Sequence, residues 1–200
     1  MRTRFLAALV LATPLFGTIT PYFTDYFATW NGLKWQANGT ISAGGLRLTS
    51  ADAAGGMAMS LVPPPSAFYE IVTTLRLSQS GGRFTILARA SADARYGTVT
   101  TGSFYGVDFS NVVTSGASGT ATMKVVKRVN GVLTQVALVP VGVWDGMAIR
   151  VLVRPGGPQG FLFSVTLGDR HTYYGDGDAA LTSLMPGLGV AGAAAASGFS

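Results

Sequence analysis

The stretch that decides the fold is ATMKVVKRV-NG-VLTQVALV, which spans residues 121–139. Apolar and polar residues alternate in both arms, and Asn130-Gly131 separates them. Asn-Gly between alternating runs is the strongest short-range signal for a β-hairpin, because a type I′ turn needs a positive φ at both central residues. The stretch therefore predicts an antiparallel hairpin in which Val129 pairs with Val132.

This pairing also decides which side chains share a face of the sheet. Counting back from the turn places Val125 opposite Val136 and Met123 opposite Leu138, and side chains alternate between the two faces of a strand. These four apolar side chains are predicted to lie together on one buried face. The solvent-facing side would carry Lys124, Arg128 and Gln135. One buried face and one wet face are typical of a sheet in a β-sandwich.

The same signals recur along the rest of the chain. Short runs with a period of two alternate with glycine and proline turns, and no window has a convincing helical period. Besides the hairpin, the expected strands are Tyr22–Phe27, Thr40–Ser42, Leu46–Thr49, Met57–Leu61, Phe68–Leu77, Phe84–Ala90, Phe104–Phe109, Met147–Val153 and Phe161–Leu167. Longer loops are expected at Ser91–Gly102 and Ser110–Gly119. With about twelve strands in two sheets, the fold class is all-β, an antiparallel β-sandwich.

The composition supports one compact domain and argues against disorder, long surface helices and nucleic-acid binding. The chain has 200 residues, of which only 12% are charged, and its single glutamate is Glu70. Disordered chains and chains rich in surface helices both need more charge than this. The formal charge of +5 comes from scattered residues, and only Lys124, Lys127 and Arg128 form a cluster. Because a nucleic-acid site needs a continuous basic surface, no nucleic-acid partner is expected.

Residues 1–20 are predicted to be a signal peptide. Arg2 and Arg4 precede the short apolar run Phe5–Ala12, which is the order of a secretory leader. An N-terminal strand or a wrongly assigned start is the alternative. The run is too short to span a membrane, and the absence of cysteine rules out disulfides. The expectation is a secreted or periplasmic bacterial protein whose domain occupies residues 21–200.

Several segments together resemble the concanavalin A-like jelly-roll superfamily, in its laminin-G-like and bacterial glucanase-like variants. The residues that carry the resemblance are the aromatic-rich opening strand ending at Trp30, Phe68–Ile71, Ile86–Ser91, Trp144-Asp145-Gly146 before Ile149–Val151, and Leu167-Gly168-Asp169. The resemblance spans roughly residues 22–200. It implies a lectin-like jelly roll whose first and last strands pair at the centre of a sheet. Because the sequence stops at Ser200, the closing strand is expected to be missing or to lie in a longer protein.

The resemblance also shows which residues a catalytic member of the superfamily would need. Superfamily members that hydrolyse β-glucans place two glutamates on one strand, flanking an aspartate, and such hydrolysis needs two nearby carboxyl groups. This chain has one glutamate, and no acidic residue lies two to four positions from Glu70. The single histidine, His171, is expected in a turn beside Asp169 and Arg170, with no serine-elbow motif near it, and zinc would lack ligands. The chain is therefore predicted not to be an enzyme.

Calcium is the one ion that the sequence makes worth weighing. Lectin-like and laminin-G-like relatives often bind calcium through oxygen atoms in loops, and Asp176 and Asp178 could supply two such oxygens. A solvated Asp-Gly turn is the alternative, because aspartate favours turns on conformational grounds. No other cofactor is expected.

Residues for ligand binding are sought among aromatic and polar side chains near loops. A sugar site combines a flat ring for stacking with planar polar groups for hydroxyls. The candidates are Arg89, Asp93, Arg95, Tyr96, Tyr105, Tyr173 and Tyr174. The alternative for each tyrosine is a half-buried position in a strand or at a rim, and the three tryptophans are expected to anchor the core or turns.

Two functions follow from this sequence. The first is a non-catalytic module that recognises a carbohydrate or another surface polymer, as part of a larger exported protein. The second is a structural or adhesive sandwich that binds no small ligand. The feature that separates them is a cluster of exposed rings formed by the four candidate tyrosines.

Overall fold

The computed structural model describes residues 22–50, 54–77, 80–155, 161–176, 181, 185–191 and 194–199. Within these ranges the chain forms strands joined by turns and loops, and none of these residues is helical. The strands are β1 (Trp35–Gly39), β2 (Ser42–Gly44), β3 (Arg47–Thr49), β4 (Gly56–Ser60), β5 (Tyr69–Leu77), β6 (Arg83–Ala90), β7 (Phe104–Ser115), β8 (Ser118–Val129), β9 (Val132–Trp144), β10 (Met147–Pro155), β11 (Phe161–Leu167), β12 (Arg170–Asp176), β13 (Met185–Ala191) and β14 (Ala194–Phe199).

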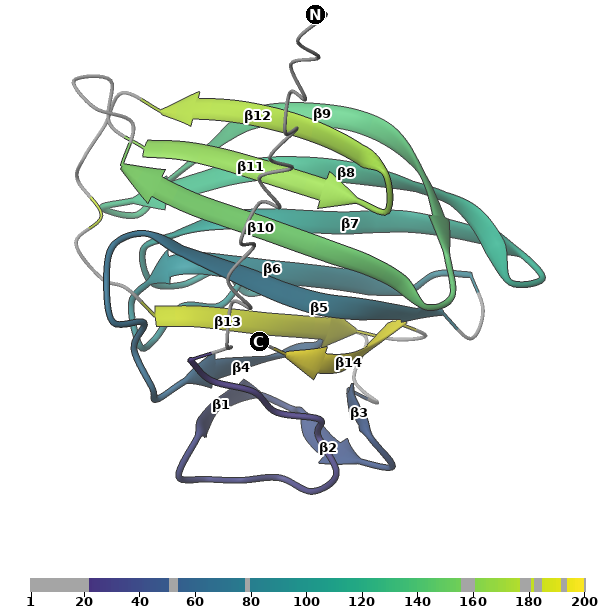
Figure 1. Cartoon of the computed structure of the whole chain (residues 1–200), viewed down its shortest axis with the longest axis horizontal. Helices are drawn as coiled ribbons and strands as arrows, with labels where there is room; N and C mark the ends of the chain where they lie inside the picture. Colours follow the sequence, from purple (N-terminus) through teal and green to yellow (C-terminus); the bar gives the residue numbers. More distant parts are fainter. Residues whose placement is uncertain are drawn as a thin grey trace, which may run out of the picture.

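The strands form two sheets of seven that pack face to face (Figure 1). The front sheet has the order β12-β11-β10-β5-β14-β3-β2, and the back sheet has the order β1-β4-β13-β6-β7-β8-β9. All the pairs between these strands are antiparallel. The predicted all-β antiparallel sandwich is therefore confirmed.

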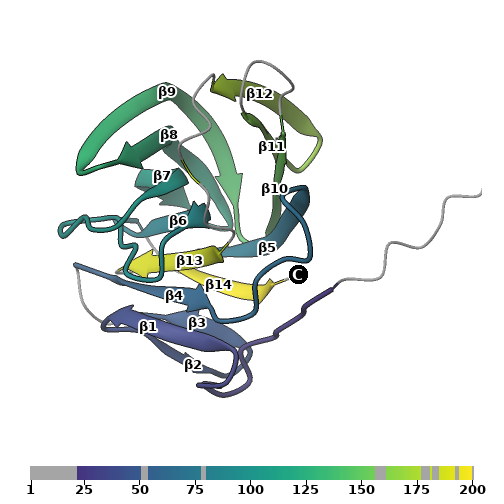
Figure 2. The same ribbon diagram turned by 90° about the vertical axis from the view of Figure 1, so that its left-hand side faces the viewer.

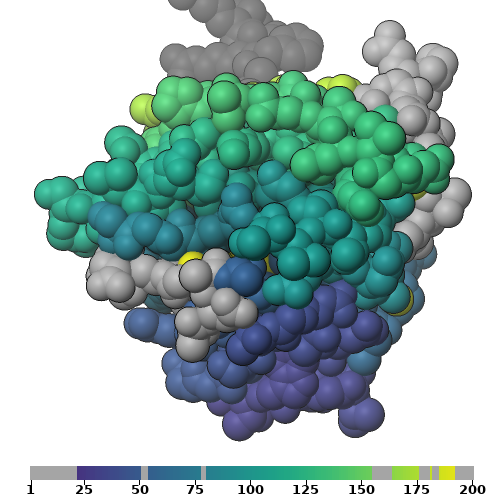
Figure 3. Space-filling model, turned by 180° about the vertical axis from the view of Figure 1, so that it is seen from behind, coloured from purple at the N-terminus to yellow at the C-terminus, as the bar shows by residue number. Residues whose placement is uncertain are grey.

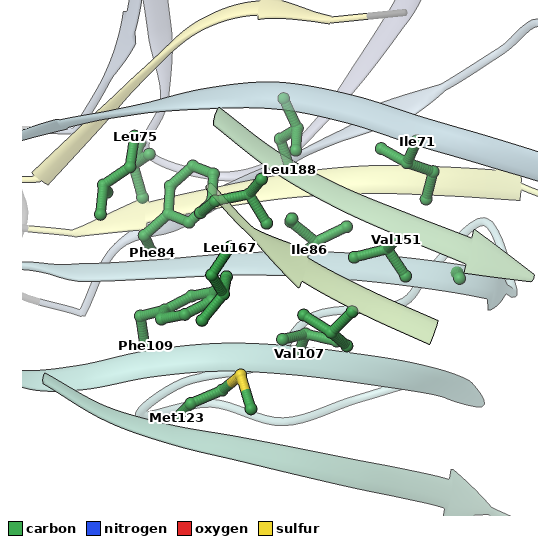
Figure 4. Close-up of a cluster of buried hydrophobic side chains, with 14 of the residues drawn as sticks. Ile71, Leu75, Phe84, Ile86, Val107, Phe109, Met123, Val151, Leu167 and Leu188 are labelled. Carbon is green, nitrogen blue, oxygen red and sulfur yellow. The ribbon is translucent and has the colours of Figure 1, made fainter. Parts of the chain in front are cut away.

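The core lies between the two sheets. Side chains with a period of two point inward from both layers, among them Ile71 and Val151 from the front sheet and Phe84, Val107 and Phe109 from the back sheet (Figure 4). All five are at most 1% exposed. Burial of this apolar surface is the main force that holds the two layers together.

The end of the chain supplies strands to the middle of both sheets. β13 lies between β4 and β6 in the back sheet, and β14 lies between β5 and β3 in the front sheet. The expectation that the family's closing strand is missing or lies in a longer protein stays a prediction. In the Ala-Gly-rich tail, Ala194–Phe199 pairs with β5 along most of its length.

The hairpin is confirmed near its turn but not along its whole length. Asn130 and Gly131 both have positive φ, and Val129 pairs with Val132. A β-bulge at the step between Val125 and Val126 then shifts the register, so that Val125 faces Ala137. The expected pairs of Val125 with Val136 and of Met123 with Leu138 are therefore wrong. Met123 and Val125 are buried, whereas Val136 and Leu138 are exposed, because the bulge leaves Val136 as its extra residue and places Leu138 opposite Lys124 on the outer face.

Three other local expectations need correction. Residues 22–27 make no named strand, and Asp25 instead accepts hydrogen bonds from the Phe27 backbone and the Trp35 indole. The expected loop at Ser110–Gly119 is the tight β7–β8 hairpin, which turns at residues 116–117. Residues 170–171 belong to β12 rather than to a turn. The predicted signal peptide lies outside the described residues.

The tryptophans take the structural positions that were expected. Trp35 is buried in the core between the rings of Phe23 and Phe27. Trp144 lies at the end of β9, and its ring covers Gly168 in the β11–β12 turn. In the part of the chain that the structure describes, no helix has the length and apolar character that crossing a membrane requires.

Candidate ligand-binding site

The outer face of the back sheet is covered by a loop of the chain itself. Strands β6 and β7 are joined by residues 91–103, here called the covering loop, and Figure 2 shows this teal segment beside the back sheet. Beneath it lies a second apolar cluster, here called the outer cluster, which is separate from the main core. Its buried members are Met57, Met59, Leu87, Ala90, Ala94, Phe104 and Val126. The middle of this face is therefore filled with apolar side chains.

Hydrogen bonds fasten the covering loop to the sheet on both sides. The Asn38 side chain, on β1, donates to the carbonyl oxygens of Ala92 and Ala94 at 2.9 Å each. Arg95 Nη2 donates to the Gly55 carbonyl at 2.9 Å, and Arg128 on β8 donates to the Gly102 carbonyl. Because these anchors come from strands at both ends of the sheet, the loop is held as a fixed part of the surface.

A polar group lies beside the outer cluster, where β6, β7 and β8 run next to each other. Asp108 is 0% exposed, and its Oδ1 accepts from Thr85 Oγ1 at 2.7 Å and pairs with Arg83 Nε at 3.2 Å. Lys124 faces Asp108 from the neighbouring strand. Burial raises the pKa of the Asp108 carboxyl group, and the charges of Arg83 and Lys124 and the Thr85 hydrogen bond offset part of that effect.

Tyr96 brings an aromatic ring to the same place. Its ring lies edge-on against Phe104, with centroids 5.8 Å apart, and the Arg83 guanidinium carbon lies 5.5 Å from the Tyr96 centroid. Burial, together with the nearby Asp108 carboxyl group, raises the pKa of Tyr96. Arg83 therefore lies between a half-buried ring and a buried carboxyl group, with 31% of its side chain exposed. Figure 3 shows this side of the molecule, with β8 and β9 in green above and the N-terminal strands in purple below.

The four candidate tyrosines do not form a cluster. Tyr96 lies on the outer face of the back sheet, whereas Tyr105, on β7, is 1% exposed and packs in the core. Tyr173 and Tyr174 belong to β12 of the front sheet. Tyr173 is exposed, and Tyr174 is half-buried against the core. The rings on which the carbohydrate prediction depended are thus dispersed over three environments.

The three remaining candidate side chains are engaged within the protein. Arg89 is buried, and its guanidinium group donates to the Leu181 carbonyl, while its backbone N–H donates to the Tyr69 hydroxyl. Asp93 accepts from Ser91 Oγ at 2.6 Å and shapes the start of the covering loop. Arg95 anchors that loop through the Gly55 carbonyl. Asp93 and Arg95 thus shape and anchor the covering loop, whereas Arg89 bonds to groups in and beside the main core.

The calcium prediction falls at the edge of what the structure describes. Asp176 is the last residue of β12, and Asp178 lies outside the described residues. Within the described ranges, no three acidic, histidine or cysteine side chains come together in a way that could hold a metal ion.

Neither of the catalytic arrangements weighed from the sequence is present among the described residues. The glucanase arrangement would need glutamates on both sides of an aspartate, but the residues beside Asp108 on the outer face of β7 are Gly106 and Ser110. Space at Gly106 is also tight, since a Cβ atom there would lie 3.1 Å from Val126 and 3.2 Å from Leu87. His171 Nε2 lies 3.0 Å from Ser164 Oγ, but its Nδ1 meets the Thr166 hydroxyl at 2.7 Å rather than a carboxylate. The histidine thus links two hydroxyl groups across the β11–β12 hairpin.

Sequence reasoning missed Arg83, Thr85 and Lys124 as members of the site. The available signal was Asp108, a carboxyl group in the otherwise apolar strand Phe104–Phe109, on the face opposite Tyr105. Its partners could be found only once the register of β6 and β8 against β7 was known.

Comparison with known proteins finds similar folds among solved structures. No protein-family model matches the sequence, and no curated protein matches it. Among solved structures, the chain is similar to the carbohydrate binding module CBM66 from Bacillus subtilis, with a TM-score of 0.57 and 16% identity over 82% of this chain and 91% of that one. It is also similar to a legume lectin-like domain from Entamoeba histolytica, with a TM-score of 0.57 and 10% identity over 84% and 88% of the two chains.

A third similar structure is an enzyme. The Bacillus licheniformis beta-glucanase matches with a TM-score of 0.55 and 9% identity, over 88% of this chain and 95% of that one. A binding module, a lectin-like domain and a hydrolase therefore share one architecture with this chain, and identities this low establish the architecture alone. The resemblance read from the sequence is confirmed at that level: the chain has the concanavalin A-like lectin/glucanase fold.

Proposed function

We propose that this chain is an exported, non-catalytic module that recognises a carbohydrate or another cell-surface polymer. The ligand would bind on the outer face of the back sheet, beside the covering loop. The observation that carries the proposal is the placement of Arg83 between the Tyr96 ring, 5.5 Å away, and the buried Asp108 carboxyl group at 3.2 Å. The guanidinium group lies over the Tyr96 ring, so an aromatic group and a planar polar group meet at one place, as in a ligand site lined by rings with a few placed polar groups.

The site has the rigidity that recognition favours. Asp108 holds Arg83 through a direct ion pair, while Phe104 supports the Tyr96 ring. Side chains that are already ordered lose little conformational freedom when a ligand binds. Lys124 lies on the next strand and adds a second cationic donor to the same surface.

The proposal excludes hydrolysis on the ground of the missing carboxyl groups. A retaining glycoside hydrolase needs two carboxyl groups about 5 Å apart. Glu70 is the single glutamate of the chain and lies on β5 of the front sheet, where it pairs with Arg150 at 3.7 Å. Asp108 therefore has no glutamate partner on its own face.

A polysaccharide and oligosaccharide array with the full chain tests this function. Binding to at least one sugar class is expected, together with an affinity loss of about tenfold or more for Tyr96→Ala and for Arg83→Ala. Tyr173→Ala is the matched control, because it removes an exposed ring from the other sheet. Equal affinity for all three variants would place binding elsewhere. A parallel assay for released reducing ends is expected to stay at background.

The structural or adhesive alternative has two observations in its favour. The four candidate tyrosines do not form the cluster of exposed rings that was expected to separate recognition from a structural role. The covering loop and the outer cluster fill the middle of the outer face with the chain's own residues, so that area is not open to a ligand. An array with no signal, with or without a chelator, would favour this alternative over recognition.

A further inference from the structure

The outer face of the back sheet carries an excess of positive charge beside the covering loop. Side chains alternate along a strand, so Lys124 and Arg128 share the outer face of β8 with Val126, a member of the outer cluster. Both cations are partly exposed. Arg83 lies on the same face, where it pairs with the buried Asp108. Three cationic side chains thus meet one carboxyl group, and the surface stays positive.

Neither of the two β8 cations has an anionic partner of its own. Lys124 faces Asp108, which already pairs with Arg83 at 3.2 Å, and among the described residues the Lys124 ammonium group makes no hydrogen bond or close ion pair. Arg128 donates to the Gly102 carbonyl oxygen, a neutral group that leaves the charge uncompensated. A guanidinium group has five N–H donors, so Arg128 keeps donors for a ligand.

The other described acidic side chains do not compensate these two cations. Asp93, in the covering loop, accepts a hydrogen bond from Ser91 and forms no close ion pair within the described part of the chain. Glu70 and Asp145 form ion pairs with arginines of β10 and β5, in the front sheet. Compensation of the charge on β8 is therefore left to the solvent or to a ligand.

The spacing of the two β8 cations indicates an extended ligand. Lys124 and Arg128 are four residues apart in one strand, which places their Cα atoms about 13 Å apart. A single sugar ring is much shorter than this distance. A ligand that meets both charges must therefore be a chain of several rings.

The aromatic ring of the site lies beside this pair of charges. Tyr96 packs against Phe104, which is the β7 residue opposite Arg128. Arg83 lies 5.5 Å from the Tyr96 ring, and its ion-pair partner on β7 is opposite Lys124. One ring among separated cations suits a sugar chain with anionic groups. A nucleic acid needs a continuous basic surface and several rings for its bases.

We propose that the ligand of this surface is an acidic polysaccharide, whose carboxylate or sulfate groups pair with Lys124 and Arg128 while a sugar ring lies against Tyr96. This inference rests on the proposed function, because it names the chemical class of the polymer that binds at the same site. Hydrogen bonds between ionised partners are about twice as strong as those between neutral groups, so an acidic polymer gains affinity that a neutral one lacks.

Two matched pairs of polymers test the class of ligand with the full chain, by affinity gel electrophoresis. Dextran sulfate is compared with dextran, and polygalacturonate with its methyl ester, so that each pair shares a backbone and differs in charge. At least one charged member is expected to bind about tenfold or more tightly than its neutral partner. The pair that shows this preference identifies sulfate or carboxylate as the recognised group. Added NaCl is expected to weaken the binding, because dissolved ions screen exposed charges.

Variants at Lys124 test the place of binding. Lys124→Gln is expected to weaken binding of the charged polymer by about fivefold or more, and Lys124→Arg is expected to retain it. Arg154→Gln is the matched control, since it removes the same charge from an exposed position of β10. Equal weakening by Lys124→Gln and Arg154→Gln would overturn the proposal, because it would show a response to net charge alone. Equally tight binding of a single-stranded oligonucleotide would overturn it as well.

Failure of this inference can be told apart from failure of the proposed function. If the neutral polymers bind as tightly as the charged ones and Tyr96→Ala weakens both, recognition at this site stands and the acidic class is wrong. If neither pair of polymers binds, the acidic class is wrong, and the sugar array then decides whether the proposed function is wrong too.

Discussion

The two faces of the back sheet are both buried, but one is covered by the front sheet and the other by a loop. On the core face, side chains such as Phe84 and Phe109 meet the front sheet in one large cluster. On the outer face, Met59 and Phe104 pack beneath a single loop in a much smaller cluster. The comparison shows that a strand can be buried on both sides while only one side is covered by a second sheet. The outer face depends on a loop, and it is the face that carries the proposed site.

Phe109→Ala and Phe104→Ala form a matched pair for this comparison. Both rings come from β7 and are 0% exposed, but they lie on opposite faces. Phe109→Ala is expected to lower the free energy of unfolding by about 3–5 kcal/mol, because two packed sheets cannot close the cavity. Phe104→Ala is expected to lower the free energy of unfolding by about 2–3 kcal/mol, since the covering loop can move inward and reduce the cavity. Urea denaturation measures both values, and equal losses would contradict the distinction.

Gly189→Ala tests how tightly the outer cluster is packed. A Cβ atom at this position would lie 2.2 Å from Met57 Sδ, although the backbone of Gly189 suits any residue. The substitution is expected to destabilise the chain by about 1–3 kcal/mol through overpacking. Shortening the opposing side chain with Met57→Ala in the same chain should recover part of the loss.

A double-mutant cycle supplies the measurement for that pair. Gly189→Ala and Met57→Ala are compared singly and together, and a clear coupling energy is expected because the two positions are in contact. Gly175→Ala is a suitable control, since a Cβ atom there would meet no heavy atom within 4 Å. Additive losses would mean that the two residues do not share one packed space.

The smallest expected effect is the pH dependence that Asp108 gives to stability. Burial raises the pKa of this carboxyl group in the folded chain above that in the unfolded chain. The contribution to stability is therefore fully present below the ordinary aspartate pKa and is lost as the pH rises through the raised value. Relative to Asp108→Asn, the natural chain should become progressively less stable as the pH rises through this window.

Urea unfolding of both chains at a series of pH values provides the check. Asp93→Asn serves as the control, because Asp93 lies in the same region at an exposed position. A difference between the natural chain and Asp108→Asn that does not change with pH would show that the carboxyl group has the same proton affinity in both states.

The sequence predicted the sandwich because period-two patterns and turns are local signals. It also predicted the β8–β9 turn at Asn130-Gly131 and the pairing of Val129 with Val132. It did not predict the bulge that exposes Leu138, because a bulge depends on how the whole edge is packed. β13 was missed because Gly187 and Gly189 suggest turns, although Leu188 and Val190 between them face the core.

The candidate site was harder to predict than the fold. Tyr105 shares its parity with Val107 and Phe109, so its burial could have been inferred from the alternation alone. The pairing of Asp108 with Arg83 could not, because it depends on the register between β6 and β7, which places Thr85 opposite Asp108. Contacts between strands that are distant in the sequence carry no local signal.

The buried methionines of this protein lie under two kinds of cover: Met123 and Met147 lie between the two sheets, whereas those of the outer cluster lie beneath a single loop. Met57 and Met59 are each 1% exposed and lie over Gly189 and Gly187. Oxidation to the sulfoxide makes a methionine side chain polar and bulkier, and burial at 1% exposure protects these sulfur atoms while the outer cluster is closed. The rate at which peroxide oxidises Met57 and Met59 therefore reports how often the outer cluster opens. The polar sulfoxides would then pack poorly beneath the covering loop.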